Sequence, residues 1–525
     1  MIRFAAPLAA LLATGALASP PADFDARVEQ VRTQSGTPGI AISIVENGKV
    51  VLAKGYGVRK LGAPETVDAD TNFTIGSTAK AMTSAALATL VDAGKLKWDD
   101  RVVDRLPGFQ MYDPWVTREI RVRDLLVHRS GLGPGAGDLL YVPRGTYSRA
   151  EIVRRLRYIK PASGFRAGYA YDNVLYIVAG ALIEAVSGQT WEDYLRTKLF
   201  APAGMTRSTD DDAHLFADAN RAQPHARFGG PVRGTGPQRV LDERDHLPQA
   251  SAPAGLVAVS ANDMARWLQI QLGRGALPGG GRLYSEARAK EMWTPVTLMP
   301  ATPAPAPVEG TSPSFQAYAL GWEVRDYHGT QIVWHVGGVY GSTSVVVLIP
   351  EKNVGFAIEL NSEEAAPRYG LMYELLDHYL GVPKQDWPAR FTAYRAQRIA
   401  DALKIVNQKA ATPAKVGPSL PLARYAGRYV DPWYGPMVVA NDGKGLRATF
   451  SPTPGMAGKL VHYQYDTFLA RFDDPSIEPA YLTFALDADG KVSRVTARPV
   501  SPIADFSYDY ADLDFAPAEK DREDH

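Results

Sequence analysis

The chain changes character at a linker that contains proline and alanine, residues 411–421. Before this linker, patterns typical of helices alternate with patterns typical of strands. After it, residues 425–507 hold only short alternating runs, with hairpin-turn signals at Asp442-Gly443 and Asp489-Gly490. A chain of 525 residues is too long for one ordinary core, so several domains are expected. We therefore predict that the second part is a small antiparallel β-barrel.

Strand patterns lie at both ends of the first part, and helical patterns lie between them. The strand patterns cover residues 39–57, 332–349 and 354–360. The helical patterns cover residues 23–35, 77–93, 175–186 and 260–272. This order predicts an α+β domain, in which the two ends of the region complete an antiparallel sheet beside a helical subdomain.

The N-terminal residues resemble an export signal. Arg3 precedes the apolar residues 4–17, and the small residues around Ala18 form a cleavage site, so we expect residues 1–18 to be removed and the protein to be periplasmic or secreted. No later segment is long and apolar enough to span a membrane. The net charge is zero, with 57 basic and 57 acidic residues, which argues against nucleic acid as a partner. A small peptide or an ester is the expected substrate.

The chain contains no cysteine, and its nine histidines show no metal-ligand spacing. Covalent catalysis would therefore need a nucleophile other than a thiol, and we predict no metal or other cofactor. Ser77 and Lys80 form an S-x-x-K motif at the start of a predicted helix, where residues i and i+3 share a face. Lys80 can activate Ser77 only if its pKa falls well below 10.4. The alternative is a helix-capping serine beside a solvated lysine.

Two further short motifs could contribute to the same site. Tyr171-Asp172-Asn173 precedes a predicted helix, and a tyrosine beside an ammonium group can lose its proton below its usual pKa and act as a base. His335 begins His335-Val336-Gly337-Gly338, in which paired glycines inside a strand mark a close approach of backbone or ligand. The backbone N–H groups of Ser77 and Gly338 could then form an oxyanion hole.

The order and spacing of these motifs resemble the family of class C β-lactamases, soluble DD-peptidases, family VIII esterases and D-aminopeptidases. The segment Leu125-Leu126-Val127-His128-Arg129-Ser130-Gly131-Leu132 is similar to a structural segment of that family. Further similarities lie at Gly255-Leu256, at Ser260 with Asp263, Met264 and Trp267, and at Gly321-Trp322. The resemblance covers residues 24–385 and implies a β-lactamase/transpeptidase-like fold.

By matching position, the resemblance implies that Ser77 is the nucleophile and that Lys80 and Tyr171 share proton transfer. It implies that Asn173 contacts the substrate and that Gly338 belongs to the oxyanion hole. His335 stands where β-lactamases usually have lysine, a pattern closer to the peptidase and esterase branches. His128 is expected to be structural.

The C-terminal unit resembles the lipocalin-like domain of some members, through residues 425–429 and 431–435. The predicted boundaries are 1–18 for the signal, 19–385 for the hydrolase domain, 386–421 for a helix and linker, 422–510 for the barrel and 511–525 for an acidic tail. Two roles remain open for the barrel, which could limit substrate length or only stabilise the chain.

Three functions remain open for the whole protein. The first is a peptidase or amidase that acts through an acyl-Ser77 intermediate on short peptides, including peptides with D-residues or linearised cyclic peptides such as microcystin. The second is a carboxylesterase with the same Ser-Lys-Tyr machinery. The third is a penicillin-binding or sensor protein that becomes acylated without turnover.

Overall fold

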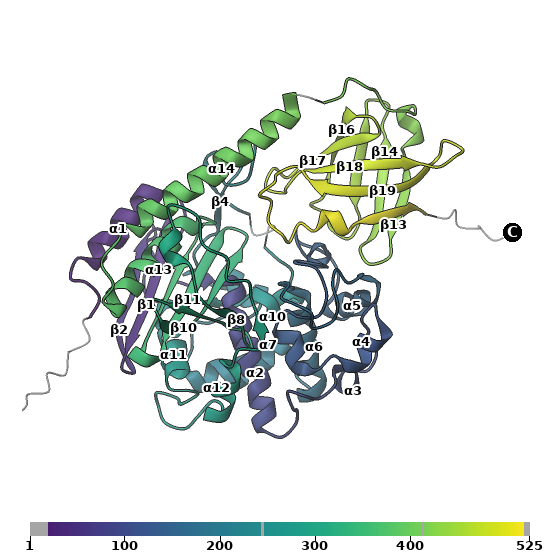
Figure 1. Cartoon of the computed structure of the whole chain (residues 1–525). Coiled ribbons are helices and arrows are strands. Elements are labelled where there is room, and N and C mark those ends of the chain that lie inside the picture. Colours follow the sequence, from purple (N-terminus) through teal and green to yellow (C-terminus); the bar gives the residue numbers. More distant parts are fainter. Residues whose placement is uncertain (1–18, 243–245, 412, 519–525) are drawn as a thin grey trace, which may run out of the picture.

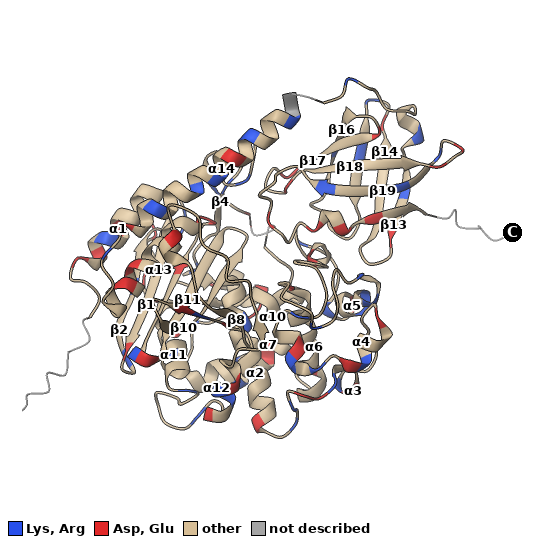
Figure 2. Ribbon diagram, in the orientation of Figure 1, with Lys and Arg blue, Asp and Glu red and all other residues tan. Residues whose placement is uncertain are grey.

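The computed structural model describes residues 19–242, 246–411 and 413–518, so the predicted signal peptide and the end of the predicted tail lie outside the described residues. The chain forms a larger α+β body and a C-terminal barrel, and helix α14 (Trp387–Ala411) extends from the first toward the second (Figure 1). Lysine, arginine, aspartate and glutamate are scattered over both bodies, as Figure 2 shows.

An eight-stranded antiparallel sheet forms the centre of the larger body, in the order β2-β1-β12-β11-β10-β9-β8-β7. The strands are β1 (Gly39–Glu46), β2 (Lys49–Gly57), β7 (Thr297–Leu298), β8 (Gln316–Tyr318), β9 (Glu323–Tyr327), β10 (Thr330–Val339), β11 (Ser342–Ile349) and β12 (Val354–Leu360). Because β1 pairs with β12, the two ends of the domain complete one sheet, which confirms the prediction.

Helices cover both faces of this sheet and each face has its own core. Helices α1 (Phe24–Ser35), α13 (Ala365–Leu380) and α14 pack their apolar side chains on one face. The other face meets the helical subdomain through α11 (Ala261–Leu272) and the turn η1 (Gly76–Ala79). The remaining helices are α2 (Lys80–Asp92), α3 (Val102–Arg105), α4 (Pro114–Glu119), α5 (Arg149–Arg155), α6 (Val174–Ser187), α7 (Trp191–Leu195), α8 (Ala201–Ala203), α9 (Asp212–Ala217), α10 (Ala252–Gly255) and α12 (Glu286–Met292).

Helices α2 and α6 form the centre of the helical subdomain. Ten residues of α2 and nine of α6 are buried, which is typical of helices surrounded by protein on all sides. Among the described residues, no single helix is long and apolar enough to cross a membrane. Helix α6 and the segment Trp191–Ala203 meet that length only as a pair bent by 75°.

The C-terminal unit is a closed barrel of eight antiparallel strands, as the alternating runs and hairpin signals predicted. The strands are β13 (Gly427–Asp431), β14 (Gly435–Asn441), β15 (Leu446–Phe450), β16 (Ala457–Gln464), β17 (Thr467–Phe472), β18 (Ala480–Leu486), β19 (Val492–Pro499) and β20 (Asp514–Pro517). Strand β20 pairs with both β13 and β19. The predicted acidic tail, residues 511–525, is therefore wrong at its start, because Asp514–Pro517 close the barrel and Tyr510–Asp512 form a 3₁₀ turn before them.

The barrel is joined to the larger body by hydrogen bonds as well as by the chain. The Tyr147 hydroxyl donates to the Tyr434 carbonyl at 2.9 Å, and Arg155 donates to the Trp433 carbonyl at 2.9 Å. The Thr146 N–H donates to the Pro452 carbonyl at 2.9 Å. The segment that carries the lipocalin-like resemblance, residues 431–435, thus lies at the interface between the two bodies.

One carboxyl group in the sheet has no counter-charge. Glu359 on β12 is 1% exposed, and neither of its carboxylate oxygens has a hydrogen-bond partner among the described residues. Burial raises its pKa from 4.5 to about 8. Because the folded state holds this proton more tightly than the unfolded state, the group favours folding at low pH, and this contribution is lost as the pH rises from 4.5 to 8.

We predict that Glu359→Gln removes this pH dependence. The free energy of unfolding of the variant minus that of the wild type should increase by on the order of 3 kcal/mol from pH 5 to pH 8. Urea denaturation of both proteins at the two pH values measures the gain, with the exposed Glu286→Gln as the control. A difference between variant and wild type that is the same at both pH values would show that Glu359 is ionised or solvated in the folded protein.

Candidate active site

Ser77 lies in the 3₁₀ turn η1 between strand β3 (Phe73–Thr74) and helix α2, where the S-x-x-K motif placed it. Residues three apart eclipse each other in a 3₁₀ turn, so the Ser77 and Lys80 side chains meet. The Lys80 Nζ lies 2.8 Å from the Ser77 Oγ. The turn begins at Gly76, which has a φ of +56°. This left-handed conformation favours glycine.

The glycines of β10 let the strand approach this turn closely. A Cβ on Gly76 would lie 2.6 Å from the Gly338 nitrogen, and a Cβ on Gly337 would lie 1.9 Å from the Ile75 carbonyl oxygen. Backbone this close leaves no room for a side chain at either position. The Gly338 nitrogen therefore lies beside the turn that carries Ser77, and both residues line one cavity, whereas the oxyanion hole itself stays a prediction.

Lys80 is completely buried, and three oxygen atoms surround its amine. In addition to Ser77, the Asn173 side-chain carbonyl and the Ala254 backbone carbonyl each lie 2.7 Å from Nζ. Burial lowers the Lys80 pKa from 10.5 to about 7, although the negative charges of Asp138 and Asp172 oppose this effect. The structure thus places beside the serine hydroxyl an amine whose neutral form is well populated at neutral pH, which is the condition that the sequence analysis required of Lys80.

Tyr171 lies against both residues, with Lys80 Nζ 5.0 Å from the centre of its ring. Burial raises the Tyr171 pKa well above 10, and a hydrogen bond with the Ser77 side chain lowers it only in part. The expected lowering of the Tyr171 pKa is therefore wrong. The cause is burial of the phenol, which disfavours the charged phenolate more than the hydrogen bond with Ser77 favours it.

The segment from Leu125 to Leu132 holds the loop that carries Tyr171 and Asn173. Nδ1 of His128 accepts a hydrogen bond from the Asp172 N–H at 3.1 Å, and the His128 ring packs 4.1 Å from the Tyr171 ring, centre to centre. The Ser130 hydroxyl donates to the Asp172 carboxylate at 2.8 Å. These contacts agree with the structural role predicted for His128.

The His335 ring lies 6.4 Å from the Tyr171 ring, centre to centre. Its Nε2 lies 2.7 Å from the Tyr318 hydroxyl, and its Nδ1 lies 2.7 Å from the Val336 carbonyl. Burial and the nearby Lys80 lower the His335 pKa from 6.5 to about 3. The imidazole is therefore neutral at physiological pH, and it cannot supply the positive charge that a lysine would provide at this position.

Asp138 is a buried member of the site that the sequence analysis missed. Its carboxylate accepts hydrogen bonds from the Asn173 amide at 2.8 Å, from the Ser507 hydroxyl at 2.7 Å and from the Tyr141 hydroxyl. Burial raises its pKa to about 7. Asp138 thus connects the residue that contacts Lys80 to a residue of the barrel. No local motif marks it, because Asn173 and Ser507 are distant in sequence.

The barrel enters the site through residues 505–509. Phe506 packs edge-on against Tyr171, with 5.7 Å between ring centres. The Asp509 carboxylate accepts hydrogen bonds from the Gly137 and Leu139 N–H groups at 2.8 and 3.1 Å, on either side of Asp138. The barrel therefore forms part of the wall of the site.

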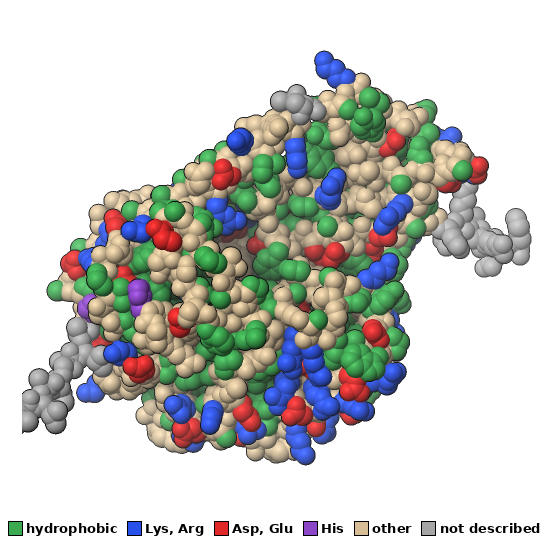
Figure 3. Space-filling view, in the orientation of Figure 1, with side chains coloured by type: hydrophobic (Ala, Val, Ile, Leu, Met, Phe, Trp, Pro, Cys, Tyr) green, Lys and Arg blue, Asp and Glu red, His purple; other side chains and the backbone are tan. Residues whose placement is uncertain are grey.

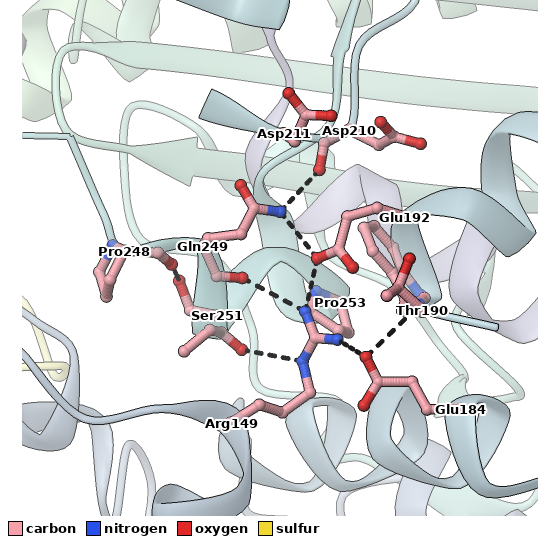
Figure 4. A network of polar contacts seen from close by, with 12 residues as sticks. Arg149, Glu184, Thr190, Glu192, Asp210, Asp211, Pro248, Gln249, Ser251 and Pro253 are labelled. Atoms are coloured by element: carbon pink, nitrogen blue, oxygen red, sulfur yellow. Dashed lines mark hydrogen bonds and ion pairs between the residues drawn. The ribbon is translucent and has the colours of Figure 1, made fainter. Parts of the chain in front are cut away.

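A polar network anchors the segment that supplies the Ala254 carbonyl (Figure 4). Arg149 on α5 contacts the carboxylates of Glu184 and Glu192, and it donates to the Gln249 carbonyl at 3.3 Å. The Gln249 amide in turn donates to Glu192 at 2.7 Å. These contacts tie α5, α6 and α7 to the chain just before α10, whose Ala254 carbonyl reaches Lys80.

The residues around Ser77 line a cavity of about 360 Å³. Ser77, Tyr171, Asn173, His335 and Gly338 all lie in its wall. No lysine or arginine is among its described lining residues, whereas Glu323 and Asp505 are. In the part of the chain that the structure describes, no group of three or more histidine or acidic side chains could hold a metal ion.

Comparisons with protein families agree with this geometry. Residues 24–401 match the Beta-lactamase family model, and residues 411–517 match a domain of unknown function, DUF3471. Unguisins hydrolase ungD' of Aspergillus campestris is 31% identical over 80% of this chain and 78% of its own length. Penicillin-binding protein 4 of Amycolatopsis lactamdurans is 31% identical over 69% of this chain and 91% of its own length.

Solved structures share the fold. The octameric penicillin-binding protein homologue from Pyrococcus abyssi is 22% identical, with a TM-score of 0.56 over 90% of this chain and 97% of its own. The penicillin binding protein from Bacillus halodurans is 19% identical, with a TM-score of 0.54 over 66% of this chain and 99% of its own. The predicted β-lactamase/transpeptidase-like fold is thereby confirmed.

The two glycines of β10 provide a matched pair of substitutions. Gly337→Ala should destabilise the protein by about 2 kcal/mol or more and displace the Ser77 turn, because the new Cβ would overlap the Ile75 carbonyl. Gly338→Ala should leave stability nearly unchanged, since no atom lies within 4 Å of its Cβ position and the N–H is kept. Thermal unfolding and the rate of serine labelling by a fluorophosphonate measure both effects. Equal behaviour of the two variants would contradict the close approach of β10.

Proposed function

Because the chain belongs to the β-lactamase family, whose members are typically serine hydrolases, we propose that it is an exported serine hydrolase that cleaves short peptides through an acyl-Ser77 intermediate. The observation that carries this proposal is the contact of 2.8 Å between the Ser77 hydroxyl and a buried amine whose pKa is about 7. A serine becomes a useful nucleophile when such a base is within hydrogen-bond reach.

The hydrogen-bond partners of Lys80 favour its role as the base. The Asn173 and Ala254 carbonyl oxygens can only accept, so they take the two protons of the neutral amine. The lone pair of Nζ is then directed at the remaining neighbour, the Ser77 hydroxyl. As the Ser77 oxygen bonds to the substrate carbonyl carbon, its proton passes to Lys80, and the N–H groups of Ser77 and Gly338 stabilise the negative charge on the carbonyl oxygen.

Tyr171 is suited to deliver a proton to the leaving group. Its raised pKa keeps the phenol protonated at neutral pH. When the tetrahedral intermediate collapses, the bond from carbon to the leaving nitrogen breaks, and the phenol donates its proton to that nitrogen while it takes one from the Lys80 ammonium. A water molecule then attacks the acyl carbon, and Lys80 again accepts the proton. The bond from that carbon to the Ser77 oxygen breaks, Lys80 returns the proton to this oxygen, and the carboxylic acid product leaves.

Two observations support peptides over β-lactam antibiotics as substrates. The cavity wall contains a neutral His335 and no described lysine or arginine, so it offers no fixed positive charge for the carboxylate of a penicillin. Two relatives are named as hydrolases of unguisins. Short peptides, including D-residue-containing or linearised cyclic peptides such as microcystin, therefore remain our proposal, with a carboxylesterase as the second candidate, since esters need less protonation of the leaving group.

Substitution of the three central residues tests the mechanism. Ser77→Ala should lower kcat/KM by about 10³-fold or more, because no other hydroxyl can form the acyl intermediate. Tyr171→Phe should lower it by about 10²-fold or more for amides, but less for nitrophenyl esters, whose leaving group needs no proton. The measurement is the rate of cleavage of a D/L peptide panel and of nitrophenyl esters. Full activity of Ser77→Ala would contradict the proposal.

The pH dependence should report the Lys80 amine. We predict that kcat/KM falls about tenfold per pH unit below a midpoint near pH 7, because protonated Lys80 cannot accept the serine proton. Asp138→Asn should move this midpoint to lower pH, because the Asp138 charge raises the Lys80 pKa. A rate that does not change between pH 5.5 and 8.5, or a midpoint that moves upward in Asp138→Asn, would contradict Lys80 as the base.

A third experiment separates the candidate functions. The protein is incubated with penicillin, and its intact mass is followed over time beside Ser77→Ala. We expect no lasting adduct, because the cavity lacks a fixed positive charge for the antibiotic carboxylate. A stable penicilloyl adduct would indicate the penicillin-binding or sensor function, and turnover of nitrophenyl esters without turnover of any peptide would indicate the esterase.

A further inference from the structure

A second cavity, of about 290 Å³, lies beside the active-site cavity. The two cavities share part of their walls, including Gly338, Asp505 and Ser507. On the face shown in Figure 3, the surface is hollowed where the barrel meets the larger body. Because Gly338 stands beside Ser77, a substrate with its carbonyl group at Ser77 can extend directly into the second cavity.

The only arginine in the described wall of this cavity is already paired. Arg233 donates to both carboxylate oxygens of Glu363, at 2.6 and 2.8 Å, and also to the Ser476 carbonyl. Its guanidinium lies 5.4 Å from the centre of the Tyr340 ring. Glu363 therefore cancels its charge, and no described lysine lines the cavity.

Glu478, from the barrel, faces the same cavity without a partner of its own. It is 3% exposed, and one of its carboxylate oxygens has no hydrogen-bond partner among the described residues. Burial raises its pKa to about 7, and the charge of Arg233 is the largest effect in the opposite direction. A second acid, Asp505, lies in the wall shared by both cavities, where it is exposed and accepts a hydrogen bond from the Ser507 N–H at 2.9 Å.

The cavity thus contains two acids in excess of its one cation. Buried carboxylates normally have a counter-charge or several hydrogen bonds, because an isolated buried charge is costly. A cation that arrives with the substrate would provide the missing partner. An anionic group would meet like charges on this side of Ser77. The first cavity also presents an acid, Glu323.

Building on the proposed function, we propose that the second cavity is a subsite for a cationic group of the substrate, a primary ammonium or a guanidinium, held by Glu478 and Asp505. The larger body contributes the wall of this subsite at Gly338, and the barrel contributes the two acids. The barrel thereby selects substrates by charge as well as by size. The cation is either the free amino terminus of a short peptide or a basic side chain near the scissile bond.

Three peptide p-nitroanilides with the same residue at the scissile bond test this subsite, each in D and L series. The neutral peptide has an acetylated amino terminus and a norleucine. The first cationic peptide has an acetylated amino terminus and a lysine in place of the norleucine, and the second has the norleucine and a free amino terminus. The wild type should prefer one of the two cationic peptides over the neutral one by about tenfold or more in kcat/KM. The preferred peptide shows whether the cation is the terminus or the side chain.

Charge-removing variants assign the preference to the two acids. Glu478→Gln should abolish the preference and change turnover of the neutral peptide less than about threefold, and Asp505→Asn, which alters a more exposed side chain, should weaken it. Glu359→Gln is the matched control, because it removes another buried carboxyl outside both cavities and should keep the preference. Equal rates on cationic and neutral peptides in the wild type, or a preference that survives both variants, would overturn the subsite.

A covalent probe separates failure of the subsite from failure of the proposed function. Ser77 is labelled with a pair of diphenyl phosphonates, one with an aminobutyl chain and one with a pentyl chain. Faster labelling by the aminobutyl compound, lost in Glu478→Gln, supports the subsite without any turnover. Equal labelling by both compounds overturns the subsite alone, and absence of any labelling contradicts the serine hydrolase itself.

Discussion

The burial of the Lys80 amine among three oxygen atoms is the interaction on which the arrangement of the catalytic domain depends. Burial of an amine that makes no hydrogen bonds is strongly unfavourable, so the three oxygen atoms allow Lys80 to be buried. This burial lowers the Lys80 pKa to about 7. The oxygens come from the turn η1, from the loop before α6 and from α10. Helices α2, α6 and α10 must therefore pack in one arrangement for the amine to be both neutral and directed at Ser77.

The barrel extends this arrangement beyond the catalytic domain. Ser507 shares the Asp138 carboxylate with Asn173, and Asp509 holds the backbone on both sides of Asp138. The electrostatic environment of Lys80 is consequently set by both bodies. The same loop brings Asp505 and Phe506 into the cavity wall, so barrel residues that contact Asp138 and barrel residues that line the cavity are neighbours in sequence.

Local spacing explains which features could be predicted from the sequence. The hairpins and the barrel have short-range signals, so the barrel was predicted correctly. Ser77 and Lys80 are one turn apart, so their contact could also be predicted, whereas the catalytic roles of Ser77, Lys80 and Tyr171 stay predictions. No motif marks Asp138 or Glu478. Asp138 meets Ser507 across 369 residues, and Glu478 comes to its cavity from the barrel through the tertiary fold alone. The predicted direction of the Tyr171 pKa was wrong because burial of the phenol, which raises the pKa, outweighs the hydrogen bond with Ser77, which lowers it. The last strand was assigned to a tail because its acidic composition conceals its pairing with β13 and β19.

The most direct test is to titrate the Lys80 amine itself. The protein is labelled with ¹⁵N at lysine Nζ, and the Lys80 signal is assigned by its disappearance in Lys80→Met and followed by NMR from pH 5 to pH 11. A midpoint near pH 7 is the predicted result, because the buried amine loses its proton about three pH units below an exposed lysine. A midpoint near 10.4 would show a permanently charged ammonium, which cannot take the proton of Ser77.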